Sequence, residues 1–244
     1  MAVDKNKIIK WVQDYFKQNS PTSKAIIGIS GGKDSTVAAA LCVAALGPAR
    51  VIGVRMPEHF QSDEMDAYRV CEHLNIASYR LDIGDACDAI YSELQATEMN
   101  NWDSSIVKTN VPARIRMTTL YAVAGALGGR VCCTSNGSEA YVGYSTKWGD
   151  GVGDFAPLRN MTVTEVIDLG RQLGMPEDLL IKPPADGLSG KTDEDNLGFT
   201  YAELDKYIRT GIIEDTEKKE RIDSMHKRNL FKLQLMPCFK PEII

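Results

Sequence analysis

Apolar and polar positions in the first half of the chain form two alternating kinds of segment. Compact apolar runs rich in β-branched residues predict strands at residues 25–29, 50–56, 77–83 and 130–134. Apolar residues at helical spacing, or alanine-rich runs, predict helices at residues 7–16, 35–46, 63–74, 85–99 and 113–127. Strands that alternate with helices favour a parallel sheet covered on both faces. The predicted fold class is therefore α/β, a three-layer α/β/α arrangement around a central parallel sheet.

The second half of the chain combines further helices with polar or glycine-rich connections. Helices are predicted at residues 162–173, 201–208 and 214–228, and polar connections at residues 100–110 and 182–196. Residues 143–153 carry four glycines with aromatic and charged residues between them, so we expect a mobile loop that closes over a ligand. Because no internal repeat or linker separates these pieces, we predict one domain over residues 1–244.

Composition and charge exclude several classes of protein. The formal net charge of −5 argues against a protein that holds nucleic acid by a general positive field. The longest apolar run, residues 37–46, is shorter than the roughly 20 residues of a membrane helix, and the N-terminus lacks an apolar signal core, so we expect a cytoplasmic protein. Six cysteines without a CxxC pair disfavour a structural zinc site.

The most informative segment is the turn between the first predicted strand and the helix after it. Residues 28–35 read GISGGKDS, which places small residues at the start of a helix. Gly31 and Gly32 allow a sharp turn, and the exposed N–H groups and the positive helix end suit a phosphate. The pattern GxxxxGK[ST] fails because Asp34 follows Lys33, and GxGxxG fails because residue 30 is Ser. The turn therefore predicts a phosphate site of another type.

Residues 30–35, SGGKDS, resemble the SGGxDS signature of the PP-loop ATP pyrophosphatases. These enzymes cleave ATP between its α and β phosphates. The resemblance implies that the loop amides, Ser30 and Ser35 hold pyrophosphate and that Asp34 binds Mg²⁺. Lys33 stands at the variable position of the signature, so no required role is assigned to it. The ATP-binding residues implied in this segment are Gly28, Ile29, Ser30, Gly31, Gly32, Lys33, Asp34 and Ser35.

Segments from the second half of the chain resemble the NAD synthetase family. They are TSNGSE at residues 134–139, GYSTKWGDG at residues 143–151 with Asp154 and Pro157, residues 182–194, and His226 to Arg228. The family converts deamido-NAD to NAD with ATP, Mg²⁺ and ammonia. The resemblance implies that the substrate carboxylate attacks the α-phosphate, pyrophosphate leaves, and ammonia displaces AMP, so no protein nucleophile is needed. Positioning and electrostatic stabilisation would supply the rate.

The same resemblance assigns further site residues. Thr134 matches an ATP contact, and Glu139 joins Asp34 as a metal ligand. The implied deamido-NAD contacts are Arg114, Lys147, Asp154, His226 and Lys227. His59 and His73 have no motif support, and we interpret both as structural.

Two positions depart from the family pattern in ways that concern ATP. Val163 stands where the family usually carries an ATP-contacting lysine, a charge that Lys182 could replace. Pro184 replaces a Ser or Thr that contacts ATP, and proline offers neither a hydroxyl nor an N–H. A weakened hold on ATP is the resulting hypothesis, and an ordinary Michaelis constant for ATP would count against it.

The nitrogen donor and the quaternary structure follow from the resemblance. Only one predicted helix precedes the PP-loop, which leaves no room for an N-terminal glutamine amidase domain, so we expect direct use of ammonia. The family's ammonia-dependent members are homodimers, which implies a C2 dimer. Two alternatives are another PP-loop enzyme, such as a tRNA-thiolating protein, and a nucleotide sensor without turnover. A thiolating protein would favour paired catalytic cysteines and a basic RNA-binding surface, so the net negative charge and the unpaired cysteines disfavour it.

Overall fold

A four-stranded parallel sheet lies at the centre of the computed structural model, which describes residues 3–61, 63–182 and 192–240. Its strands are β1 (Lys24–Gly28), β2 (Val51–Arg55), β3 (Ala77–Arg80) and β4 (Gly129–Val131), in the order β3-β2-β1-β4. Ile26 pairs with Ile52 on one side and with Val131 on the other. All four predicted strands are confirmed, each within a few residues of the expected bounds.

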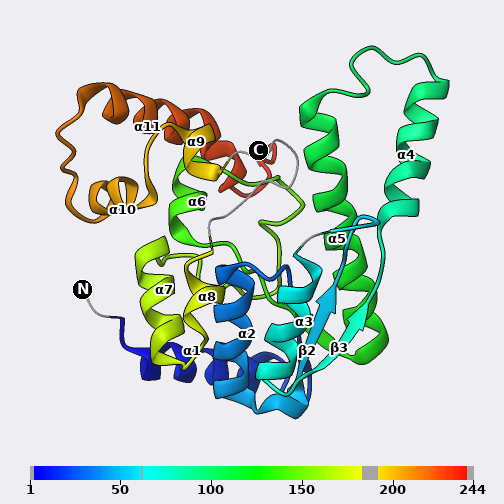
Figure 1. Ribbon diagram of the computed structural model, residues 1–244, viewed down its shortest axis with the longest axis vertical. Helices are drawn as coiled ribbons and strands as arrows, with labels where there is room; N and C mark the ends of the chain where they lie inside the picture. The colour runs from blue at the N-terminus through cyan, green and yellow to red at the C-terminus, as the bar shows by residue number, and fades with distance from the viewer. Residues whose placement is uncertain (1–2, 62, 183–191, 241–244) are drawn as a thin grey trace, which may run out of the picture.

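Helices cover both faces of the sheet, which confirms the predicted three layers (Figure 1). Ala25 and Ile27 belong to one buried cluster, whereas Ile26 between them belongs to another, because successive side chains of a strand point to opposite faces. The first cluster includes residues from α1 (Lys5–Asn19), α2 (Lys33–Leu46), α3 (Glu64–His73), α7 (Val163–Gln172) and α8 (Glu177–Leu180). The second includes residues from α4 (Gly84–Ala96) and α5 (Ser105–Leu127).

Helix α5 begins earlier than the sequence predicts. The expected helix covers residues 113–127, but α5 starts at Ser105, in the middle of the predicted polar connection. The Ser104 side chain accepts a hydrogen bond from the backbone N–H of Val107 and so caps the helix. Val107, Val111 and Ile115 recur every fourth residue and pack on the cluster that contains α4. The polar residues between them concealed this spacing.

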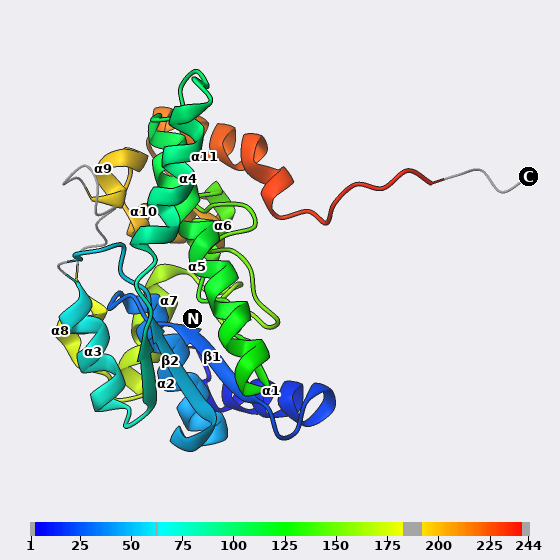
Figure 2. The ribbon, with the colours of Figure 1, turned by 90° about the vertical axis from the view of Figure 1, so that its right-hand side faces the viewer.

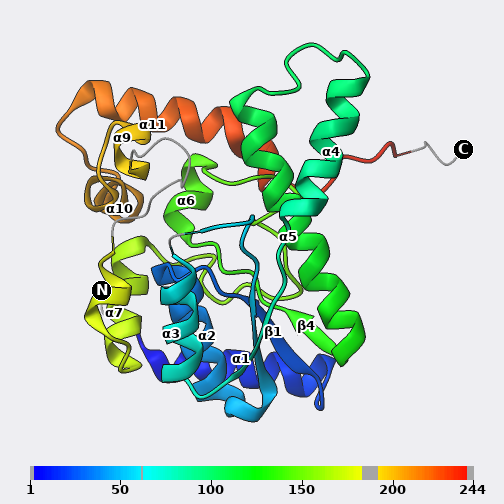
Figure 3. The same ribbon diagram turned by 45° about the vertical axis from the view of Figure 1, so that its right-hand side comes forward.

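A third buried cluster joins the C-terminal helices at the end of the sheet toward which the strands run (Figures 1 and 3). These helices are α6 (Gly137–Val142), α9 (Asp193–Leu197), α10 (Tyr201–Thr210) and α11 (Thr216–Asn229). Helices α10 and α11 confirm two predictions. Helix α9 begins inside the region expected to be a loop, residues 182–196. Helices α6 and α8 and the 3-10 turns η1 (Pro48–Arg50) and η2 (Leu230–Lys232) were not expected.

Two other segments bear on the site. Within residues 143–153, the backbone N–H of Thr146 donates to Asp150 Oδ1 (2.7 Å) and that of Gly149 donates to the Thr146 carbonyl (3.0 Å). Closure of this loop over a ligand remains a prediction. Residues 236–240 run away from the body of the molecule (Figure 2). Among the helices described, none combines the length and apolar character that crossing a bilayer requires.

Candidate active site

The turn between β1 and α2 is tightly held. The backbone N–H of Ile29 donates to the Val54 carbonyl (2.9 Å), and the Ser35 hydroxyl donates to the Gly32 carbonyl (3.0 Å). Gly31 has φ +83°, and a Cβ there would lie 2.9 Å from the backbone nitrogen of Ala67. Only glycine fits this position without strain, since both the backbone conformation and the close approach of α3 exclude a side chain.

A cavity of about 140 Å³ opens beside this turn, beyond the C-terminal ends of the strands. That is where parallel α/β sheets bind ligands. Its lining residues are Ser30, Gly32, Asp34, Ser35, Thr134, Ser135, Glu139 and Asp150. The cavity therefore gathers six of the predicted ATP and metal residues, although Thr134 and Glu139 are about a hundred residues away from the turn in the sequence.

Three carboxylates line the cavity, and two of them, Asp34 and Glu139, both lie beside Lys33. Asp34 Oδ1 accepts a hydrogen bond from Asn136 Nδ2 (3.0 Å), and Asp34 Oδ2 accepts one from Lys33 Nζ (2.9 Å). The Asn136 side chain also caps α6, where it accepts the backbone N–H of Glu139 (3.0 Å). Burial and the nearby charge of Asp34 raise the pKa of Glu139 to about 8. Closely spaced acidic oxygens are the donors that Mg²⁺ prefers, so this pair fits such an ion.

Lys33 is buried next to both carboxylates. Its Nζ lies 3.9 Å from Glu139 Oε1 and 5.5 Å from the centre of the Tyr201 ring. Burial acts against the charged form of Lys33, but Asp34 and Glu139 outweigh it, so the pKa of Lys33 is raised above its ordinary value. The ammonium therefore carries its positive charge in the folded protein.

A buried network holds the helix that carries Glu139. The Ser138 hydroxyl donates to Asp205 Oδ1 (2.5 Å) and accepts the backbone N–H of Val163 (3.1 Å). Asp205 Oδ2 accepts both the backbone N–H and the hydroxyl of Thr164, each at 2.7 Å. The network thereby joins α6, α7 and α10, and Val163 itself is a buried residue in the first turn of α7.

The predicted deamido-NAD contacts lie at three separate places. The Arg114 guanidinium donates to the Lys147 carbonyl, and Lys147 lines a second cavity of about 200 Å³ that also includes Trp148. His226 stacks on the Tyr141 ring with centroids 4.1 Å apart, and Lys227 is exposed further along α11. Asp154 is not among the lining residues of either cavity; its Oδ2 accepts the backbone N–H of Val131 (2.7 Å) at the edge of the sheet.

The structure bears on one of the two departures from the family pattern, the one at Val163. Lys182 Nζ forms ion pairs with Asp63 and, at 2.7 Å, with Asp66, so its charge is already engaged at the start of α3. This arrangement does not support Lys182 as the replacement for the charge absent at Val163. Pro184 lies outside the described residues.

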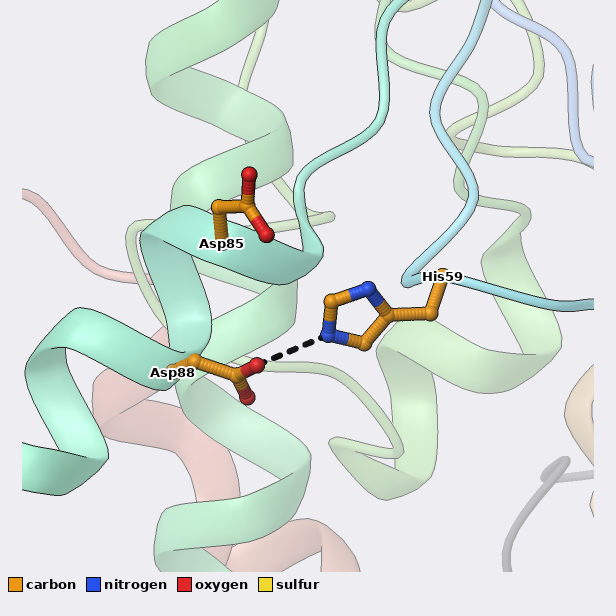
Figure 4. A group of neighbouring side chains, drawn as sticks. All are labelled: His59, Asp85 and Asp88. Atoms are coloured by element: carbon orange, nitrogen blue, oxygen red, sulfur yellow. Dashed lines mark hydrogen bonds and ion pairs between the residues drawn. The ribbon is translucent and has the colours of Figure 1, made fainter.

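His59 belongs to a surface cluster outside the cavity (Figure 4). Its Nε2 lies 2.8 Å from Asp88 Oδ2, and Asp85 is close by. The His59 backbone N–H also donates to Asp82 Oδ1 (3.0 Å), and its ring fills the space where a side chain at Gly84 would lie. The hydrogen bond to Asp88 raises the pKa of His59. These contacts connect the segment after β2 to α4, in agreement with a structural interpretation.

Sequence reasoning missed three residues at or beside the cavity. Ser135, Asn136 and Asp150 lie within the segments that resemble the family, but no role was assigned to them. Their polar side chains next to candidate site residues were the available signal. Their contacts in the folded protein, however, join residues that lie far apart in the sequence. Lys33 was included among the implied ATP-binding residues without a required role, and its contacts with both carboxylates were not predicted.

Comparison with known proteins places the chain in a family. The model of the NAD synthase family matches residues 5–240. An NH₃-dependent NAD⁺ synthetase from Carboxydothermus hydrogenoformans is 36% identical over 230 residues, covering 92% of this chain and 93% of the relative. One from Pyrococcus furiosus is 40% identical over 203 residues, covering 83% and 77%. The solved structure of NMN synthetase from Francisella tularensis has a TM-score of 0.87 and 36% identity, covering 98% and 97%. This chain is therefore a member of the NAD synthase family.

Proposed function

We propose that the chain is a ligase that amidates deamido-NAD with ammonia and ATP to give NAD, AMP and pyrophosphate. The observation that carries the proposal is the cavity in which the phosphate-binding turn, Thr134 and two carboxylates meet in a member of this family. The pyridine carboxylate of the substrate attacks the ATP α-phosphate and pyrophosphate departs. Ammonia then attacks the resulting mixed anhydride at its carbonyl carbon, releases AMP, and loses a proton as the amide forms.

The residues of the turn are suited to the departing pyrophosphate. Gly32 caps α2, so the free N–H groups at the start of this 14-residue helix and its positive dipole end face the cavity. Ser30 and Ser35 add hydroxyl groups at the same place. Asp34 and Glu139 would hold Mg²⁺, which neutralises phosphate charge when it is bound.

We assign Arg114, Lys147, Asp154, His226 and Lys227 to the deamido-NAD site, as the family resemblance implies. The hydrogen bond from Arg114 to the Lys147 carbonyl supports this assignment, because it holds Arg114 against the segment that lines the second cavity, and a guanidinium and an ammonium both suit a diphosphate or a carboxylate. The family match over residues 5–240 supports one synthetase domain.

A second candidate substrate is favoured by one comparison. The similar structure from Francisella tularensis is named NMN synthetase, and the acid precursor of NMN carries the same pyridine carboxylate on a mononucleotide. The chemistry at the ATP cavity would be identical for both acceptors. The choice between them depends on the contacts made by the far half of the dinucleotide.

The deciding experiment supplies purified protein with ATP, Mg²⁺ and either deamido-NAD or nicotinic acid mononucleotide, with ammonium or glutamine as the nitrogen source. We expect NAD from deamido-NAD with ammonium, and no product with glutamine alone. A kcat/KM that is higher for the mononucleotide would transfer the assignment to NMN synthesis. No pyrophosphate release with any acceptor would refute both and favour a nucleotide sensor.

Lys147→Ala is expected to raise the KM for deamido-NAD by about 10- to 100-fold while leaving the KM for ATP within about twofold, because a charge-assisted contact to an anion is worth about 1.5–3 kcal/mol. Steady-state kinetics with each substrate varied in turn measures both constants. Lys147→Arg keeps the charge, so its KM for deamido-NAD should lie between that of the unaltered protein and that of Lys147→Ala. An effect confined to ATP would reassign Lys147 to the nucleotide.

We also propose a homodimer in which α5 meets a second copy. Only Pro112 and Ala124 of its 23 residues are buried, while the small residues Ala122, Gly125 and Ala126 are exposed on a mostly apolar stretch. Such a surface suits close helix packing. Light scattering on the eluted protein should give twice the chain mass, and a monomer at micromolar concentration would contradict the proposal.

A further inference from the structure

Lys33 occupies an unusual place for a lysine. It is the first residue of α2, only 6% exposed, and its ammonium lies beside two carboxylates that are themselves mostly buried. Lysine is almost never buried unless it is paired. Here the pairing is with Asp34 at 2.9 Å and with Glu139 at 3.9 Å, the two residues assigned to the divalent cation.

The oxygen atoms that Lys33 uses are the ones a metal ion would need. Asn136 donates to Asp34 Oδ1 and Lys33 Nζ donates to Asp34 Oδ2, so both oxygens of Asp34 are already in contact with a donor, and Lys33 is the one of the two donors that carries a positive charge. A divalent ion between Asp34 and Glu139 would lie within a few ångströms of the ammonium. Two positive charges at such a separation in a poorly solvated cavity repel each other strongly.

A second position for the Lys33 ammonium, away from Asp34, lies beside Tyr201. Its ammonium lies 5.5 Å from the centre of the Tyr201 ring, whose face attracts a cation. The Tyr201 hydroxyl donates to Asp193 Oδ2 (3.3 Å), which places another carboxylate on the same side. A side-chain rotation toward α9 and α10 would thus keep the charge compensated.

We propose that Lys33 is a resident counter-cation that competes with the divalent ion for Asp34 and Glu139 and so sets the affinity of the site for that ion. The inference rests on the metal assignment in the proposed function. Lys33 is a positioning residue in this account: without an ion it holds the two carboxylates together, and an arriving ion must displace it. The variable position of the signature then becomes a place where cation affinity is adjusted.

The test measures Mn²⁺ binding by electron paramagnetic resonance in the full chain without ATP. Lys33→Met should bind Mn²⁺ about tenfold more tightly than the unaltered protein, since it removes the competing charge. Lys33→Arg, which keeps the charge, should stay close to the unaltered protein. Lys10→Met removes one charge from an exposed pair on α1 and should change nothing, which excludes an effect of net charge. Lys33→Gln offers a second neutral variant if Lys33→Met fails to fold.

A second readout is thermal stability. Without Mn²⁺ the neutral Lys33 variants should melt at a lower temperature, because the Asp34 carboxylate loses the cation with which it pairs, and Mn²⁺ should raise their melting temperature more than that of the unaltered protein. Equal Mn²⁺ affinity in Lys33→Met and the unaltered protein would overturn the inference and leave the metal site intact. Binding in Asp34→Asn as strong as in the unaltered protein, or no binding in any variant, would instead overturn the metal assignment and the inference with it.

Discussion

Replacing Asp34 with alanine is expected to lower the rate of NAD formation about a thousandfold, with the protein still folded. Losing a group that stabilises transition-state charge typically costs a factor of about 10²–10³ in kcat, and this change removes one of two carboxylates proposed to hold the ion that faces the phosphates. It also deprives Lys33 and Asn136 of their shared acceptor. Pyrophosphate release and NAD formation measure the loss, and thermal melting checks the fold.

Two companion variants sharpen this test. Asp34→Asn keeps the shape of the side chain and its contact with Asn136 but loses the charge, so it should be nearly as inactive as the alanine variant. Asp14→Ala makes the same chemical change on the exposed side of α1, where Asp14 pairs with Lys10, and should keep full activity. Activity of Asp34→Ala within tenfold of the unaltered protein would refute the metal assignment.

The second large effect is on stability. Asp205→Ala should lower the free energy of unfolding by about 3 kcal/mol, because it leaves the buried Ser138 hydroxyl without its acceptor and breaks two hydrogen bonds from Thr164. For a chain of this length that corresponds to a melting temperature lower by about 6–12 °C. Activity per folded molecule should fall as well, since the adjacent Glu139 depends on the same helix for its position.

The matching control is Asp168→Ala. Asp168 is half-exposed and pairs with Arg171 on the surface of α7, so its removal should cost less than about 1 kcal/mol. Asp205→Asn keeps one acceptor oxygen and should lose an intermediate amount of stability. If Asp205→Ala and Asp168→Ala had the same melting temperature, the network around Asp205 would not be what holds α6 in place.

The sequence predicted the sheet and the phosphate-binding turn because their signals are local. Buried parallel strands such as β1 and β2 are continuous apolar runs, and the SGGKDS string lies within one turn. Helix α6 has only six residues, which is too short for a periodic pattern to emerge. The start of α5 was missed for a different reason. Its apolar residues recur every fourth position, but polar residues stand between them, so the segment reads as a polar connection.

Contacts across long stretches of chain account for what the sequence did not predict at the site. The bond from Asn136 to Asp34 spans 102 residues, and that from Ser138 to Asp205 spans 67. Local pattern carries no information about such pairs. The resemblance supplied Glu139 and Thr134, but it could not show that Lys33 would lie between the carboxylates, because that depends on how α6 and α10 pack against the start of α2.

The position of Asp154 has a consequence for how the protein behaves at high concentration. Strand β4 lies at the edge of the sheet, and an uncovered edge invites strands from other molecules to pair with it. Here Asp154 Oδ2 accepts the Val131 N–H, the Phe155 carbonyl accepts the Cys133 N–H, and the backbone N–H of Asp154 donates to the Val131 carbonyl. The outward-facing groups of Val131 and the Cys133 N–H are thus occupied from within the chain, which protects this edge of the sheet against the addition of a strand from another molecule.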